Sequence, residues 1–353
     1  MPERHPSRRL AFAAAPLLIA TALAPSVLAL RTASVGEEAA EAAKAFADSL
    51  DTAQRKEAIF AFETDKRLAW HFIPKDDRKG VIFGELSDGQ KQRLLTLGQG
   101  LLSDAGLRKT RGAMQLEALV AALEGEGRRW PRDPELYYVT LFGDPAAFGQ
   151  PGQRWGFSFE GHHVSLNFTF EGTEVIDSTP QFLGAHPATV MDENALGLPK
   201  GYQLLGEEET LGFDLLASLS ESQRSRAIIQ DEPPAEVLTA GKPSPLEGAA
   251  AGLPAADMTD AQRATLTKLI GLYTEVVADP LANARSTAIG DSLDGVHFAW
   301  AGGDEPGEPH YYRIEGPSFE IELANTQPDA EGNPANHSHA MLRDNRGDFG
   351  LDR

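Results

Sequence analysis

Histidine occurs in two pairs, and imidazole is the side chain of this sequence best suited to holding a metal ion. The first pair, His162 and His163, opens the stretch that runs to Phe170. The second pair, His337 and His339, lies far downstream. If the second pair lies on a strand, its two side chains share a face and lie about 6.5–7 Å apart along the chain. Two imidazoles at that spacing can bind one ion, and His163 is the natural third ligand.

The fourth possible metal ligand is His310, which follows Glu308-Pro309. The 353-residue chain has no cysteine, so nitrogen and oxygen atoms must hold any metal, a ligand set that suits zinc or copper. We therefore predict a divalent transition-metal site. Its predicted ligands are His163, His310, His337 and His339.

The alternative is that the histidines are structural and form hydrogen bonds with backbone and acidic groups around turns. His162 illustrates this alternative, because strand alternation places it on the same face as Val164 and Leu166. For His162 the structural interpretation is favoured over a role as ligand.

Two carboxylates and an arginine are candidates for catalysis beside such a site. Glu160 and Glu315 each precede a glycine, and in a duplicated protein they would hold equivalent positions and could approach one another. One could then act as a general acid or base, with its pKa moved by the other. Arg343 would contact the substrate. The competing explanation, which we favour for the glutamates, is that each one stabilises its own turn.

The elements that must position these residues are helices followed by strands. Apolar residues recur at helical spacing from Gly36 to Phe72, and helices are also expected from Ser87 to Ser103 and over 110–124. Strands follow at 136–142, 154–159 and 162–170. In the last strand apolar residues alternate with polar ones, so one face is buried and the other faces a ligand.

The second half of the sequence repeats landmarks of the first in the same order. Asp48–Arg55 resembles Ala217–Arg224, and Leu86–Gln90 resembles Met258–Gln262. These repeats predict an α+β protein with an internal duplication, in which each half has helices followed by antiparallel strands. The predicted boundaries are a signal peptide over 1–29, a first half over 30–205 and a second half over 206–353. The Pro-, Gly- and Ala-rich segment Asp231–Pro254 is expected to be a linker or surface loop.

The N-terminus is typical of an export signal. Basic residues precede the apolar stretch Leu10–Leu23, and Val27-Leu28-Ala29 fits a cleavage site. Ser7–Leu10 also resembles a twin-arginine signal, so both export routes stay open. The sequence thus predicts a periplasmic or secreted protein with no membrane attachment after signal removal. The net charge of −20 argues against binding nucleic acid.

The chain resembles the domain-of-unknown-function 3500 family, whose members occur in bacteria and some fungi and have no established activity. The resemblance covers nearly all of the mature chain. The segments that carry it are Glu160–His163, Gly307–His310, Asn325–Gln327, Asn336–His339 and Gly347–Gly350. The resemblance implies one family over the whole chain and transfers no activity.

These observations predict an exported metal-binding protein with a His-rich site between its halves, where a metal ion would support hydrolysis or oxidation of a small-molecule substrate. The alternative is a non-catalytic periplasmic binding or scaffold protein with structural histidines. The sequence contains no Gly-x-Ser-x-Gly elbow, no phosphate-binding glycine loop, no dinucleotide fingerprint and no His-Glu-x-x-His helix, which disfavours the common hydrolase and nucleotide-binding classes.

Overall fold

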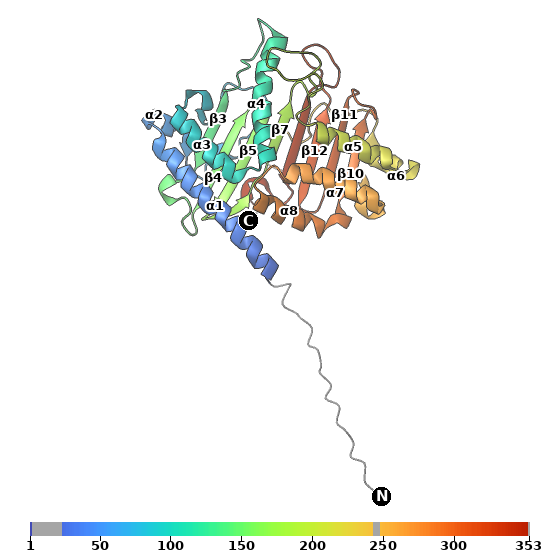
Figure 1. Cartoon of the computed structure of the whole chain (residues 1–353), viewed down its shortest axis with the longest axis horizontal. Helices are drawn as coiled ribbons and strands as arrows, with labels where there is room; N and C mark the ends of the chain where they lie inside the picture. The colour runs from blue at the N-terminus through green and yellow to red at the C-terminus, as the bar shows by residue number, and fades with distance from the viewer. Residues whose placement is uncertain (2–22, 243–247, 352–353) are drawn as a thin grey trace.

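The structure is a computed structural model that describes Met1 and residues 23–242 and 248–351. Most of the predicted signal peptide, residues 2–22, lies outside the described residues. Within them, a mixed α+β architecture packs helices against one large, mostly antiparallel sheet (Figure 1). The predicted α+β class is therefore confirmed. No helix of the described residues is long and apolar enough to cross a membrane.

The α-helices of the described residues pack largely on one face of the sheet (Figure 1). They are α1 (Leu23–Ser49), α2 (Thr52–Ala58), α3 (Asp88–Leu101), α4 (Asp104–Glu124), α5 (Gly206–Ser218), α6 (Glu221–Ala227), α7 (Asp260–Thr274) and α8 (Asp279–Gly290).

The strands of the first half of the chain are β1 (Ile59–Phe60), β2 (Val81–Ile82), β3 (Tyr137–Phe142), β4 (Arg154–Gly161), β5 (Val164–Glu171), β6 (Glu174–Asp177) and β7 (Gln181–Ala185). Those of the second half are β8 (Ile228–Gln230), β9 (Leu253–Pro254), β10 (His297–Gly302), β11 (His310–Glu315), β12 (Phe319–Asn325) and β13 (Ser338–Asp344). All of them join a single 13-stranded sheet in the described part of the chain.

The main path of the sheet runs β1-β3-β4-β5-β7-β13-β12-β11-β10-β8. Strands β7 and β13 pair antiparallel at the centre, so one sheet contains strands from both halves of the sequence. Outermost on this path, β1 and β8 pair parallel with β3 and β10. The centre of the sheet is therefore where remote segments of the chain meet.

The larger hydrophobic core lies between the helices and the sheet. Ala39, Ala43, Phe46 and Leu50, which recur at helical spacing in the sequence, are all buried there along α1 and just beyond it. The helical pattern was expected to reach Phe72, but α2 ends at Ala58. The apolar pair Ile59–Phe60 instead joins the sheet beside β3.

Two irregular segments cover part of the opposite face of the sheet. Trp70 and Phe72 come from the segment between β1 and β2, and Val237 comes from the segment after β8. All three pack with Phe182 and Met341 of the central strands, and the Phe72 ring stacks on that of Phe182 with centroids 3.7 Å apart. The first part of the segment predicted to be a linker is therefore part of a buried core.

Candidate metal centre

The tight turn between β4 and β5 positions the first two histidines. Its two residues are His162 and His163, and His163 has a φ of 62°, which non-glycine residues rarely adopt. Its backbone N–H donates to the Phe72 carbonyl at 2.9 Å, and its own carbonyl accepts from the Gly184 N–H at 2.8 Å. His163 therefore lies in the turn itself, not on the polar face of the strand as the sequence predicted.

Glycine at position 184 makes room for the His163 ring. A Cβ atom added at Gly184 would lie 2.8 Å from Cγ of His163, which is closer than real Cβ atoms approach other atoms. Gly184 pairs with His339 in the β7–β13 ladder. The imidazole of His163 thus lies against the strand pair that carries His339, with His337 just before β13.

Three imidazole nitrogens meet at this point. Nε2 of His163 lies 2.8 Å from Nε2 of His337 and 3.2 Å from Nε2 of His339. The third side of the triangle, between His337 and His339, is 3.1 Å. The ring centroids are farther apart than the nitrogens, at 4.7–5.0 Å, so the three rings spread outward from a shared centre.

A carboxylate fixes the orientation of one of these rings. Nδ1 of His339 lies 2.6 Å from Oε1 of Glu236, which also accepts from the Val237 N–H at 2.8 Å. The Gln327 amide donates to the other carboxylate oxygen at 3.2 Å. The proton of His339 is thus placed on Nδ1, and the lone pair of its Nε2 faces the other two imidazoles.

His162 adds a fourth imidazole beside the triangle. Its ring stacks on that of His163 with centroids 3.7 Å apart, and its Nδ1 contacts both the Glu117 carboxyl and Nη1 of Arg132, the latter at 3.1 Å. His162, His163 and His337 each offer a ligand atom within 4.8 Å of the others, a group that could hold a metal ion. Burial raises the pKa of Glu117 to about 8.

His186 completes the cluster from the loop after β7. Its ring lies parallel to that of His337, with centroids 4.2 Å apart and an interplanar angle of 9°. Within the described residues, both of its ring nitrogens are buried without a hydrogen-bond partner. Burial lowers its pKa to about 4, so this ring is neutral at neutral pH.

Burial also sets the protonation state of the central imidazoles. It holds the pKa of both His163 and His337 well below the usual value, and the neighbouring histidines lower it further. Neutral imidazole is the form that binds a metal ion. His163 and His337 are therefore in their metal-binding form at neutral pH.

The structure brings together three of the four predicted metal ligands, and His310 is not among them. His310 lies on β11, where its ring stacks on Trp300 and its Nδ1 lies 2.8 Å from the Glu308 carbonyl oxygen. Its Nε2 faces Glu209 at 3.3 Å. Strands β12 and β13 separate it from β7, so we leave it out of the proposed site.

The two candidate catalytic glutamates do not approach one another. Glu160 is on β4 and Glu315 is on β11, with four strands between them, or about 24 Å at the usual strand spacing. Glu160 is buried in an ion pair with Lys79 at 2.8 Å, and Glu315 faces Arg313 at 3.4 Å. Each carboxylate therefore has a cation from its own half of the chain.

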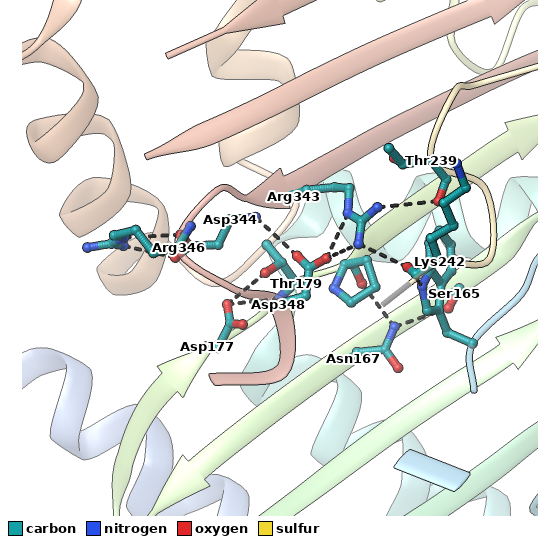
Figure 2. A network of polar contacts seen from close by, with 12 residues as sticks. Ser165, Asn167, Asp177, Thr179, Thr239, Lys242, Arg343, Asp344, Arg346 and Asp348 are labelled. Carbon is teal, nitrogen blue, oxygen red and sulfur yellow. Dashed lines mark hydrogen bonds and ion pairs between the residues drawn. The ribbon is translucent and has the colours of Figure 1, made fainter. Parts of the chain in front are cut away.

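Arg343, the predicted substrate contact, is fully buried, and protein acceptors surround its guanidinium (Figure 2). Its Nε donates to Asp348 at 2.7 Å, and its Nη1 and Nη2 donate to the carbonyls of Thr239 and Lys242 at 3.3 and 3.0 Å. The side chain thus ties the C-terminal end of the chain to the segment that follows β8. We leave it out of the proposed site as well.

Three residues of the cluster were not predicted as site residues. Glu236 belongs to the segment expected to be a linker, His186 was given no role, and His162 was interpreted as structural. The signal that could have identified His162 is its place in a two-residue turn, where side chains no longer alternate as they do in a strand. For Glu236 and His186 the sequence offers no comparable pattern.

The chain is thus an α+β protein with a buried cluster of imidazoles at the centre of one sheet. The model of the family described as "Protein of unknown function (DUF3500)" matches residues 32–351. The chain belongs to this family, which confirms the resemblance seen in the sequence. No curated protein and no solved structure matches the chain.

Proposed function

We propose that the protein binds one divalent transition-metal ion, zinc or copper, through Nε2 of His163, His337 and His339. The observation that carries the proposal is the triangle of nitrogens with sides of 2.8, 3.1 and 3.2 Å. A hydrogen bond along one side of the triangle needs an N–H on one nitrogen and a lone pair on the other. Three nitrogens cannot satisfy all three sides in this way, so without a cation at least one pair of like groups would face one another. A cation at the centre turns that repulsion into three bonds.

The size of the triangle fits such an ion. A circle through the three nitrogens has a radius of about 1.8 Å, slightly less than the Zn–N distance of about 2.0–2.1 Å. The three Nε2 atoms of His163, His337 and His339 would therefore hold an ion of about this size. The carboxylate of Glu236 behind His339 is the partner that metal-bound imidazoles usually have.

Three protein ligands leave a coordination position for water, substrate or a fourth side chain. His162 is the nearest further imidazole, and it belongs with His163 and His337 to the group that could hold an ion. An ion with an open position activates water or binds an oxidisable ligand, so the class we propose is a metal-dependent hydrolase or oxidase.

Metal analysis and calorimetric titration of the mature protein test this proposal. We expect about one equivalent of zinc or copper per chain, and His339→Ala should lower the affinity at least about a hundredfold. His297→Ala is the matched control, because His297 lies at the start of β10, away from the cluster, and its Nδ1 meets the Gly295 carbonyl of its own turn. Stoichiometric binding that survives His339→Ala would contradict the site. Absence of binding would favour the alternative, a binding or scaffold protein with structural histidines.

We also propose that the two halves arose by internal duplication. Gln54 and Gln90, the latter in the capping box of α3, exchange amide hydrogen bonds, and Gln223 and Gln262 do the same in the second half. Gln90 and Gln262 each also donate to the carbonyl of a serine, Ser49 and Ser218. Counted inward from one edge of the sheet, the main path has the first-half strands β1, β3, β4, β5 and β7. Counted inward from the other edge, it has the second-half strands β8, β10, β11, β12 and β13. In both halves the strands follow the chain in the same order, which supports the proposal further.

Export to the periplasm or medium is the remaining part of the proposal. It rests on the basic and apolar N-terminal pattern, which lies mostly outside the described residues. Cell fractionation and the mass of the mature chain test it. Cleavage after Ala29 is the expected result, and recovery of the full-length chain from the cytoplasm would contradict it.

A further inference from the structure

A cavity lies between α3, α4 and the helix-facing side of β4 and β5, away from the imidazole cluster. Its volume is about 300 Å³, within the range of cavities that hold small ligands. Its floor and much of its wall are apolar. Phe157, Phe159, Leu166 and Phe168 form the floor, and Leu94, Leu101, Leu107 and Met114 stand among the residues of the walls.

The cavity exists because α3 has a glycine where its counterpart in the second half has a large side chain. Gly98 and Ile270 hold the same position counted from the N-caps Ser87 and Thr259. Ile270 is buried in the core, whereas a Cβ atom added at Gly98 would have only Leu107 near it, at 3.8 Å. The space at Gly98 is therefore open to an occupant.

A second position shows the same contrast. Leu101 and Tyr273 are also equivalent when counted from the two N-caps. The Tyr273 hydroxyl meets that of Tyr312 at 2.6 Å, so two large side chains fill the second half at this point. In the first half the leucine lines the cavity instead.

The rim of the cavity carries polar and charged side chains: Asp88, Lys91, Gln92 and Arg111. Lys91 is paired with Glu135 at 2.6 Å. Arg111 is exposed, and within the described residues it has no ion-pair partner. On a chain with a net charge of −20, a cation placed at the mouth of an apolar cavity favours an anionic group on the occupant.

We propose that this cavity binds a medium-chain carboxylic acid, with the aliphatic tail against β4 and β5 and the carboxylate beside Arg111. A tail of that kind satisfies the apolar lining, and a single anionic head matches the single unpaired cation at the rim.

Calorimetric titration of the mature protein with decanoic acid and with decan-1-ol tests the proposal. Decanoic acid should bind, and Gly98→Ile, which copies the residue of the second half, should weaken it about tenfold or more. Gly100→Ile is the matched control on the same helix, because a Cβ there meets nothing within 4 Å and the residue does not line the cavity. Thermal unfolding of both variants shows that they are folded.

Arg111→Ala tests the contact with the carboxylate of the ligand independently of the contacts with its aliphatic tail. It should weaken decanoic acid about fivefold or more and leave decan-1-ol unchanged. Failure of decanoic acid to bind the wild type, or equal binding to Gly98→Ile, would overturn the assignment of the cavity. Equal affinity for acid and alcohol, or no effect of Arg111→Ala, would overturn the assignment of the carboxylate.

Discussion

Replacing His163 by asparagine should abolish metal binding with little change in the stability of the metal-free protein. The reason is that the backbone of His163 is strained, and asparagine relieves this strain. Its φ of 62° costs an ordinary residue about 1–2 kcal/mol, whereas asparagine tolerates this region well. The backbone bonds of the turn, to Phe72 and from Gly184, do not involve the side chain and should survive. Loss of the ring stacked on His162 costs about 0.5–1.5 kcal/mol in the opposite direction.

The net effect on the metal-free protein is therefore small. We expect the free energy of unfolding of metal-free His163→Asn to lie within about 1 kcal/mol of the wild type. The difference should appear only with metal. At a free metal concentration about a hundred times the Kd, binding stabilises the wild type by about 2.7 kcal/mol, or roughly 4 °C in Tm for a chain of this length. The variant should gain almost nothing.

Urea and thermal unfolding, each followed by circular dichroism with chelator and with excess zinc or copper, measure these quantities. His297→Asn serves as the control and should show the full gain with metal. A His163→Asn variant that keeps the wild-type gain would refute the proposed ligand. A loss of several kcal/mol without metal would show that the imidazole is needed for folding instead.

Three other outcomes follow from contacts of the site and its surroundings. Glu236→Gln should lower the metal affinity about 10–100-fold with the fold unchanged, because it weakens the acceptor behind His339; calorimetry measures this, and unchanged affinity would contradict it. In the folded protein the pKa of Glu117 is raised from its usual 4.5 to about 8, so protonation of this carboxyl stabilises the fold. This stabilisation is lost as the pH rises from about 4.5 to 8. Urea unfolding across that range should show a slope, at most about 1.4 kcal/mol per pH unit, that Glu117→Gln reduces; an identical slope in the variant would contradict it. Arg343→Met should destabilise the fold by about 3–5 kcal/mol, because it leaves the buried Asp348 carboxyl without its cation. Adding Asp348→Asn should restore part of this loss in the same urea assay. An Arg343→Met variant as stable as the wild type would contradict the prediction.

The sequence was informative where a side chain follows a regular period. The alternation from Val164 to Phe170 predicted β5 and its buried apolar face, although the polar face expected to meet a ligand is buried as well. The two-residue spacing of His337 and His339 predicted that their rings approach one another, although β13 begins at Ser338 and contains only His339. The helix expected from Ser87 begins at that residue, which caps α3, and Thr259 of the matching segment Met258–Gln262 caps α7 in the same way. In each case local chemistry decides the local structure, so one sequence is enough.

Prediction failed where tertiary contacts decide. Glu236 reaches His339 because its segment packs on the sheet through Val237, and that contact depends on residues remote in the sequence. The separation of Glu160 and Glu315 follows from the order of the strands, which the hydrophobic pattern does not contain. His310 was grouped with the other histidines by residue type alone, although β11 places it beside Trp300.

Beside the central pairing of β7 with β13, the proposed ligands from the two halves of the chain meet at one point. His163 and His337 are 174 residues apart in the sequence, so an ion shared by them would act as a reversible cross-link that closes a loop of that length. Such a link would stabilise only the folded chain, by mass action, in a protein that has no cysteine with which to form a disulfide.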